Sequence, residues 1–313
     1  MNNQQNSSDI PLRALGLTGV EVTAIGVGGY HLGLIKDDNE AIRLTQEAID
    51  AGITFLDNAW EYHDGRSEEL MGRSIHDRRD KVFLMTKVCT HGRDRHVAMR
   101  QLEDSLRRLK TDYLDLWQVH EVVYDNEPEL HFADGGVIEA LEQARREGKV
   151  RFTGFTGHKS PEIHLKMLSY DYPFDACQLP LNCFDATFRS FERKVLPELE
   201  RRGIAAIGMK SLGGEGDMVR AGAVAAEEAL RYAMSLPIAT VVSGMESLNV
   251  LRQNLGVARS FTPMSDDEMR LLRERCAAMA GDGRFEQFKT TAKFEGPVGR
   301  EQHGFPPQNE LKI

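Results

Sequence analysis

Short apolar segments alternate with amphipathic segments along most of the chain. The apolar segments have the length of strands and are rich in Val, Ile, Phe and Leu, whereas the segments between them carry apolar residues at helical spacing. The pattern predicts strands at residues 24–28, 53–57, 82–86, 114–119, 151–156, 175–179, 204–209 and 238–243. It predicts the helices that follow them at residues 39–51, 67–76, 94–109, 136–147, 161–169, 192–202, 221–236 and 247–258.

These strand–helix units form an architectural repeat. Their strands are continuously apolar, which is typical of a parallel sheet covered by helices on its faces. Eight such units in roughly 250 residues predict a closed (β/α)8 barrel, the α/β architecture also called a TIM barrel. The alternative is an open, doubly wound sheet, which usually has GxGxxG after its first strand. Here the first strand leads into Gly26-Val27-Gly28-Gly29-Tyr30-His31, which lacks the third glycine, so the barrel is favoured.

The two ends of the chain extend beyond the repeat. Residues 13–17 and 20–24 flank Thr18-Gly19 and predict a small hairpin. The segment Ser265-Asp266-Asp267-Glu268 has the spacing of a capping box and predicts a helix through about Ala280. We therefore expect a single domain over residues 1–313, with a flexible N-terminus at 1–12, the barrel at 13–260, and a C-terminal helix and tail at 261–313. The tail has no clear period, and two readings stay open for it: packing on the outside of the barrel, or crossing the barrel mouth beside the substrate.

Charge and cysteine content exclude several classes of protein. The formal net charge of -9 disfavours a nucleic-acid partner, because a surface that binds phosphates should be basic. The polar start of the chain lacks the apolar core of a secretory signal, and no apolar run approaches the roughly 18 residues of a membrane helix. The cysteines, Cys89, Cys177, Cys183 and Cys276, have no metal-binding spacing. We expect a cytoplasmic protein with reduced thiols and no metal.

Reactive side chains coincide with the ends of three consecutive predicted strands. Asp57 ends the second strand, Lys87 the third and His120 the fourth, and Tyr62 lies in the loop after the second strand. Barrel enzymes place their chemistry at the carboxyl ends of the strands, so these four side chains are expected at one rim. An ammonium group beside a tyrosine favours the phenolate and lowers its pKa, while a carboxylate such as Asp57 can balance the lysine. The set suits proton donation to a carbonyl oxygen, with hydride supplied by a bound nicotinamide.

At these residues the sequence resembles the aldo-keto reductase family, over roughly residues 12–258. The resemblance lies in Phe55–Tyr62 with Ser67–Gly72, in Met85-Thr86-Lys87, and in Leu116–His120. It implies an NAD(P)-dependent oxidoreductase that interconverts a carbonyl compound and its alcohol. By this resemblance Tyr62 is the general acid/base, Lys87 lowers its pKa, Asp57 pairs with Lys87, and His120 orients the carbonyl.

The resemblance also implies cofactor and substrate positions. Gly28 and Gly29 would lie beside the nicotinamide, and Gln178 would bond its carboxamide. The usual Ser-Asn pair for that amide is replaced by Thr156 with His158, and the usual stacking tyrosine is replaced by Met209. The remaining cofactor positions are Asp57, Lys210, Ser211, Leu212, Gly213, Gly244, Glu246, Gln253 and Asn254. The expected substrate-contacting residues are Tyr30, His31, Trp60, Tyr62 and His120.

Two features of the sequence refine the expected cofactor. Glu246 stands just after the eighth strand, where a carboxylate repels a 2'-phosphate but can accept a hydrogen bond from a free ribose hydroxyl. Arg252 on the next helix could reach back, so both NAD(H) and NADP(H) stay open, with NAD(H) slightly favoured.

The departures from the family's usual cofactor residues resemble a branch of the family with a ferredoxin-like C-terminal segment. Cys276 alone follows Cys183, so no iron–sulfur cluster is expected here.

Two other functions are compatible with parts of the pattern. A Schiff-base lyase could use Lys87 or Lys210, since both fall at strand ends. A non-catalytic, cofactor-binding subunit that resembles the β subunits of potassium channels would keep the same residues. The expected partner of the enzyme is a small carbonyl or alcohol substrate, with no nucleic acid and no membrane.

Overall fold

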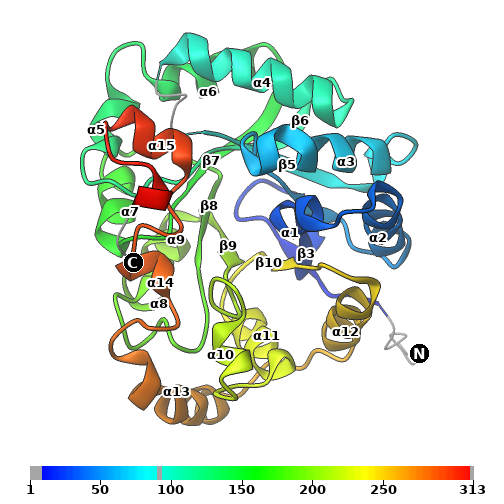
Figure 1. Ribbon diagram of the computed structural model, residues 1–313, viewed down its shortest axis with the longest axis vertical. Coiled ribbons are helices and arrows are strands. Elements are labelled where there is room, and N and C mark those ends of the chain that lie inside the picture. The colour runs from blue at the N-terminus through cyan, green and yellow to red at the C-terminus, as the bar shows by residue number, and fades with distance from the viewer. Residues whose placement is uncertain (1–8, 90–93, 311–313) are drawn as a thin grey trace.

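The computed structural model describes residues 9–89 and 94–310. Within this part, eight parallel strands close into a barrel in the order β10-β3-β4-β5-β6-β7-β8-β9, as the sequence pattern predicts (Figure 1). Each strand pairs with its neighbour in the sequence, and β10 closes the barrel by pairing with β3. The strands are β3 (Ile25–Gly28), β4 (Phe55–Asp57), β5 (Phe83–Val88), β6 (Leu114–Val119), β7 (Val150–Thr156), β8 (Ala176–Pro180), β9 (Ala205–Met209) and β10 (Thr240–Gly244).

Helices surround the barrel because each carries one apolar face that is buried against the strands. The helix after each strand matches a predicted one within a few residues. They are α2 (Asp38–Asp50), α3 (Arg66–Ser74), α4 (Arg95–Leu109), α6 (Val137–Arg146), α7 (Pro161–Leu168), α9 (Leu196–Arg202), α11 (Ala226–Ser235) and α12 (Leu248–Arg259). Shorter elements lie in the connections: α1 (Gly29–Leu34), η1 (Tyr62–Gly65), η2 (Arg79–Lys81), α5 (Glu127–Phe132), α8 (Phe191–Lys194) and α10 (Asp217–Arg220).

Two predicted helices differ from the observed ones for local reasons. The helix expected at 192–202 is divided into α8 and α9, because Pro197 lies in the first turn of α9 and has no N–H to continue the ladder from α8. The helix expected at 221–236 begins only at Ala226, because Gly222 has a left-handed φ of 69° and separates α10 from α11.

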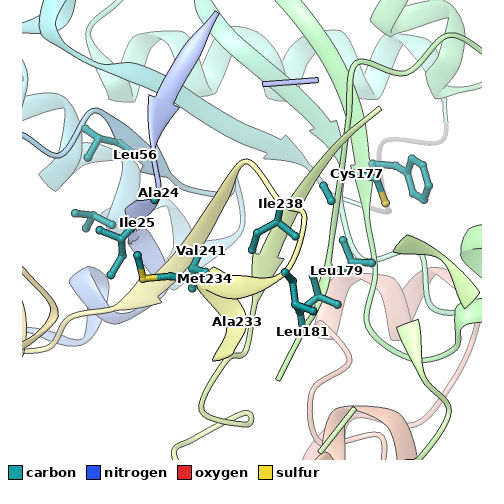
Figure 2. Packing of buried hydrophobic residues seen from close by; sticks show 14 of the residues in the cluster. Ala24, Ile25, Leu56, Cys177, Leu179, Leu181, Ala233, Met234, Ile238 and Val241 are labelled. Atoms are coloured by element: carbon teal, nitrogen blue, oxygen red, sulfur yellow. The ribbon is translucent and has the colours of Figure 1, made fainter. Parts of the chain in front are cut away.

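The main core lies between the strands and the surrounding helices. Strand residues such as Ile25 and Val241 share one cluster with helix residues such as Met234 of α11 (Figure 2). A second, smaller cluster fills the interior of the barrel near Phe55 and Phe83, whose rings stack with centroids 5.4 Å apart. The barrel is therefore a packed body, and its strand ends are held rigidly.

The predicted hairpin and C-terminal helix are both present. Strands β1 (Leu12–Ala14) and β2 (Glu21–Thr23) pair antiparallel before the barrel begins. Of the flexible segment expected at 1–12, residues 1–8 lie outside the described part, whereas Ile10 is buried. Helix α13 (Asp266–Ala280) starts with the expected capping box between Ser265 and Glu268. The tail then forms α14 (Gln287–Thr290), α15 (Pro297–Gln302) and η4 (Gln308–Glu310).

Candidate active site

Asp57 and Lys87 lie at the carboxyl ends of the adjacent strands β4 and β5. The Lys87 ammonium forms a close ion pair with Asp57 Oδ1 and also donates to the carbonyl oxygen of Asn58 at 2.7 Å. The two side chains are only 1% and 5% exposed. Burial lowers the pKa of Lys87, and the Asp57 carboxylate opposes that shift. The lysine is thus held in place by a buried carboxylate, as expected.

Tyr62 and His120 complete a group with this ion pair. Lys87 Nζ lies 5.1 Å from the centroid of the Tyr62 ring, and the His120 ring stands edge-on to Tyr62 with centroids 5.5 Å apart. Tyr62 begins the short η1 turn after β4, and His120 directly follows β6. All four residues predicted to carry chemistry therefore meet at one rim of the barrel, because parallel strands bring their carboxyl ends together.

The acidity of Tyr62 differs from the sequence-based expectation. Burial raises the pKa of Tyr62 well above its ordinary value, and the carboxylates of Asp57 and Glu61 raise it further. Burial and these carboxylates together outweigh the lowering expected from the Lys87 ammonium. Tyr62 consequently keeps its proton, as a proton donor must.

Sequence reasoning missed a carboxylate beside His120. His120 Nδ1 lies 2.6 Å from Oε1 of Glu61, and the two side chains are 12% and 11% exposed. On the other side of the same carboxylate, the Cys89 thiol donates to Oε2 at 3.2 Å. The signal in the sequence is slight: Glu61 directly precedes Tyr62 in the loop after the second strand.

Gln178 provides a test of whether this rim suits a nicotinamide. Its Nε2 atom lies 3.5 Å from Asp57 Oδ2, whereas its buried Oε1 has no hydrogen-bond partner among residues 9–89 and 94–310. An unpaired buried acceptor is costly unless a ligand donates to it. A carboxamide N–H fits this requirement. Thr156, also predicted to bind the amide, is buried and faces Gln178 in the register of β7 and β8.

Glycines at the ends of β3 and β10 allow neighbouring side chains and backbone to approach the strand ends closely. Gly28 and Gly244 are register partners, and a Cβ on Gly244 would overlap the imidazole of His31. A Cβ on Gly29 would lie 2.6 Å from the carbonyl oxygen of Asp57. These glycines are therefore needed for side chains and strand ends to pack tightly at the rim, whatever ligand the rim receives.

The segment after β9 places an ammonium group near the mouth. Lys210 follows Met209 with a left-handed φ of 54°, and its Nζ lies 5.3 and 5.2 Å from the ring centroids of Phe288 and Phe294. Burial lowers the pKa of Lys210 to about 8, against the attraction of Glu121. The turn continues through Ser211, Leu212 and Gly213, with a bridge between Ser211 and Gly213.

The predicted cofactor residues of the eighth strand–helix unit, and Arg252 beside them, have different surroundings. Glu246 is exposed just after β10, as a ribose-binding carboxylate would be. Asn254 is buried and donates to Ser243 Oγ at 3.1 Å, whereas Gln253 donates to Glu227 on α11 at 2.8 Å. Arg252 is paired with Glu47 on α2 at 2.9 Å.

Tyr30 and Trp60 border the group in different ways. The Tyr30 ring is 49% exposed and stands edge-on to Tyr62 with centroids 5.3 Å apart. The Trp60 ring instead lies under Arg108, whose guanidinium carbon is 5.4 Å from the ring centroid. Its buried indole Nε1 has no partner within the described part of the chain. Tyr30 thus borders the mouth beside Tyr62, whereas Trp60 packs against Arg108 of α4.

The C-terminal tail packs against residues that follow the barrel strands at one side of the rim. Figure 1 shows α14 and α15 on the side of the barrel near α5, α7 and α8. His158 Nδ1 lies 3.1 Å from the carbonyl oxygen of Phe288, and the amide of Gly296 donates to Glu121. Burial lowers the pKa of His158 well below its ordinary value, so the ring is neutral beneath the tail.

Buried charges fix the tail at two points. Lys289 is fully buried and pairs with Asp185 at 2.6 Å and with Glu286 at 2.9 Å. Further along, Glu295 pairs with Lys159 at 2.7 Å and with Arg300 at 2.5 Å. Removing one partner of a buried pair strongly destabilises the folded protein, because the other charge stays buried without compensation. These pairs therefore attach the tail firmly to the barrel.

The closed (β/α)8 barrel thus carries a carboxylate, an ammonium group, an imidazole and a phenol at one rim. The aldo/keto reductase family model matches residues 24–222. The chain belongs to the aldo/keto reductase family.

Named relatives agree with this assignment. The aldo-keto reductase YhdN of Bacillus subtilis is 31% identical over 194 residues, which are 58% of this chain and 55% of that protein. The matches thus span about half the length of the curated relatives. Among solved structures, the thermostable aldo-keto reductase Tm1743 has 26% identity and a TM-score of 0.70, and the match covers 85% of this chain and all of that one. An aldo-keto reductase from Klebsiella pneumoniae, solved with NADPH, has a TM-score of 0.69 at 22% identity, covering 86% and 95% of the two chains.

None of the helices in the described part of the chain combines the length and apolar character that crossing a membrane requires. Residues 9–89 and 94–310 also contain no group of three or more His, Cys, Asp or Glu side chains arranged to hold a metal ion.

Proposed function

We propose that this protein is an NAD(P)-dependent oxidoreductase that interconverts a small aldehyde or ketone and its alcohol. The observation that carries the proposal is the placement of a protonated Tyr62 beside the buried Lys87–Asp57 pair and His120, at the rim of the barrel. A phenol that keeps its proton in a partly dry site is suited to donate that proton to a carbonyl oxygen.

Each side chain has a separate task in this proposal. Tyr62 donates its proton to the carbonyl oxygen in reduction and takes it back in oxidation. Lys87 balances the negative charge left on the phenolate, and Asp57 keeps the lysine in position. His120 holds the carbonyl oxygen near Tyr62. The nicotinamide cofactor, when bound, supplies or accepts the hydride at the carbonyl carbon.

The residues that would hold the cofactor lie along the same rim. Gln178 would accept a hydrogen bond from the carboxamide through its unpaired Oε1, and the turn that contains Gly213, which has a left-handed φ of 78°, would approach the pyrophosphate. Glu246 is exposed, and Arg252 is engaged with Glu47. Because Arg252 is paired with Glu47, it is not free to balance Glu246 beside a 2'-phosphate. This supports use of NAD(H) at least as well as NADP(H), although the Klebsiella protein was solved with NADPH.

One lysine meets the chemical condition of the Schiff-base alternative. Lys87 is held in an ion pair, but burial lowers the pKa of Lys210 to about 8, which makes a neutral amine accessible. Borohydride treatment in the presence of an aldehyde distinguishes the two functions. An oxidoreductase gives no covalent adduct on Lys210 by mass spectrometry, and an adduct there would contradict the proposal.

The test is a cofactor-linked absorbance screen of aldehydes, ketones, sugars and alcohols with both nicotinamide pairs. We expect turnover with at least one carbonyl class. Tyr62→Phe should then reduce kcat by about 10²–10⁴-fold while leaving the cofactor Kd nearly unchanged. Tyr113→Phe is the matched control, because Tyr113 precedes β6 at the opposite end of the barrel. A Tyr62→Phe variant with half the wild-type kcat would remove Tyr62 from the mechanism.

A further inference from the structure

Glu61 and His120 form a buried pair inside the group described above. His120 Nδ1 lies 2.6 Å from Glu61 Oε1, an ion-pair contact that is not aligned as a hydrogen bond, and neither side chain is more than 12% exposed. Glu61 comes from the loop after β4, whereas His120 follows β6, so the pair joins two strands that are not neighbours in the barrel. A carboxylate at this place can act on the imidazole without touching a substrate.

The surroundings keep Glu61 ionised. Burial tends to raise the pKa of Glu61, but contact with His120, the Cys89 thiol and Lys87 outweighs burial, so the pKa is below its ordinary value. Burial lowers the pKa of His120, and Glu61 acts against this. The pair at neutral pH is therefore a carboxylate beside a neutral imidazole. The other titratable groups that face the pair are Asp57, Tyr62, Lys87, Glu121 and His158.

Tautomer chemistry gives this pair a consequence. A neutral imidazole carries one N–H, and a carboxylate beside Nδ1 favours the form in which Nδ1 carries it. The lone pair then lies on Nε2, the nitrogen that remains for the reacting oxygen. When Nε2 gains a proton, the ring becomes a cation, and the adjacent carboxylate stabilises that cation in a site of low polarity.

We propose that Glu61 is a positioning residue for His120: its charge beside Nδ1 keeps the ring proton on that nitrogen, so that the lone pair of Nε2 is left for the reacting oxygen, and it stabilises the imidazolium. Nε2 accepts a hydrogen bond from the alcohol in oxidation. In reduction the ring first takes up a proton from solvent at Nε2, and Nε2–H then donates a hydrogen bond to the carbonyl oxygen while Tyr62 transfers its own proton to that oxygen. No bond to carbon forms or breaks through Glu61. The inference rests on the proposed function for its catalytic part. The tautomer of His120 is a property of the protein alone.

The primary measurement needs no activity. Nitrogen NMR of the imidazole in ¹⁵N-histidine-labelled wild-type protein, assigned with His120→Asn, should show Nδ1 protonated and Nε2 unprotonated above the pKa of the ring. In Glu61→Gln, His120 should titrate about one pH unit lower, because the neutral amide no longer stabilises the imidazolium. Glu61→Asp, which keeps the charge, should largely retain the wild-type titration. The opposite tautomer in the wild-type protein would overturn the proposal even if both variants failed to fold.

The kinetic measurement uses a substrate found in the screen. Glu61→Gln should reduce kcat by about 10–100-fold, the size typical of a partner that orients a functional histidine, with KM changed far less. The acid limb of the pH–kcat profile should move in the same direction as the His120 titration.

Cys89→Ala is the matched control, because it removes the other contact of the carboxylate but leaves Oε1 beside His120. It should leave kcat within about twofold of wild type, a change of less than about 0.5 kcal/mol. Equal losses in Glu61→Gln and Cys89→Ala, or an unchanged His120 titration in Glu61→Gln, would overturn the proposal. If no carbonyl compound is turned over, the proposed function fails, whereas the NMR result still decides the role of Glu61.

Discussion

The backbone amide of Gly296 donates to both carboxyl oxygens of Glu121, at 2.8 and 2.9 Å, across a separation of 175 residues. Glu121 directly follows His120 and has a left-handed φ of 55°. Burial raises the pKa of Glu121 well above its ordinary value, and the nearby Glu61 carboxylate adds to this. The tail therefore meets the rim of the barrel within one residue of the proposed catalytic histidine.

A side chain at position 296 should disturb this contact. A Cβ there would lie 2.5 Å from Glu121 Oε2 and 3.0 Å from Glu61 Oε2, so Gly296→Ala must displace the tail or the two carboxyl groups. We expect relative kcat/KM values across a panel of carbonyl substrates to change by about tenfold, or about 1.4 kcal/mol, with little change in cofactor Kd. Gly281→Ala is the control, since its Cβ would be 3.9 Å from the nearest atom. An unchanged substrate ranking would show that the tail does not border the substrate.

Removing the charge of Lys87 should affect both stability and turnover. Lys87→Met leaves the buried Asp57 carboxylate without its partner, which costs about 3–5 kcal/mol in the free energy of unfolding. Denaturant unfolding measures this loss. The double variant Asp57→Asn/Lys87→Met should regain part of the stability but none of the activity. Wild-type stability in Lys87→Met would contradict the buried pair.

Acid sensitivity should come in part from His164 on α7. This side chain is fully buried, with its ring centroid 5.2 Å from that of Phe155 and 4.9 Å from that of Phe191. Burial lowers the pKa of His164 to about 4, against hydrogen bonding with the backbone. The unfolded chain thus binds the proton first as pH falls, so stability is complete above pH 6.5 and is lost progressively towards pH 4, by about 3 kcal/mol.

Replacing this histidine tests that assignment. His164→Phe should flatten the dependence of unfolding free energy on pH between 6.5 and 4, because a phenyl ring takes up no proton. Chemical unfolding at several pH values measures the slope. If the slope in the variant equals that of wild type, other groups cause the acid sensitivity.

Cofactor choice should respond to the charge at position 246. Glu246→Lys replaces a group that repels a 2'-phosphate with one that attracts it, so the ratio of kcat/KM for NADPH over NADH should rise about tenfold, or about 1.4 kcal/mol. Glu200→Lys makes the same charge change on α9, at an exposed position outside the predicted cofactor site, and should leave the ratio unchanged. A wild-type enzyme that favours NADPH by tenfold or more would show that another group overrides Glu246.

Much of the candidate site could be predicted because it depends on strand order. A strand of apolar residues ends where polar residues begin, and parallel strands end at the same rim, so Asp57, Lys87 and His120 had to meet. The glutamate beside His120 could not be predicted in this way. Glu61 lies in a loop whose turn contains two consecutive left-handed residues, His63 and Asp64, and local periodicity does not fix such a path.

The sequence by itself determined the barrel and its strand ends, because periodicity is a local property of the chain. The family was indicated separately, by the resemblance of the motifs around Asp57, Lys87 and His120. The tertiary structure alone decided that the tail packs against Glu121 at the rim, that Glu61 touches His120, and that burial raises the pKa of Tyr62. Each of these depends on burial and on contacts between distant segments. The effect of the Lys87 charge on the pKa of a neighbouring group depends on the carboxylate paired with the lysine and on the exposure of both groups to water. Only the folded chain determines that pairing and that exposure.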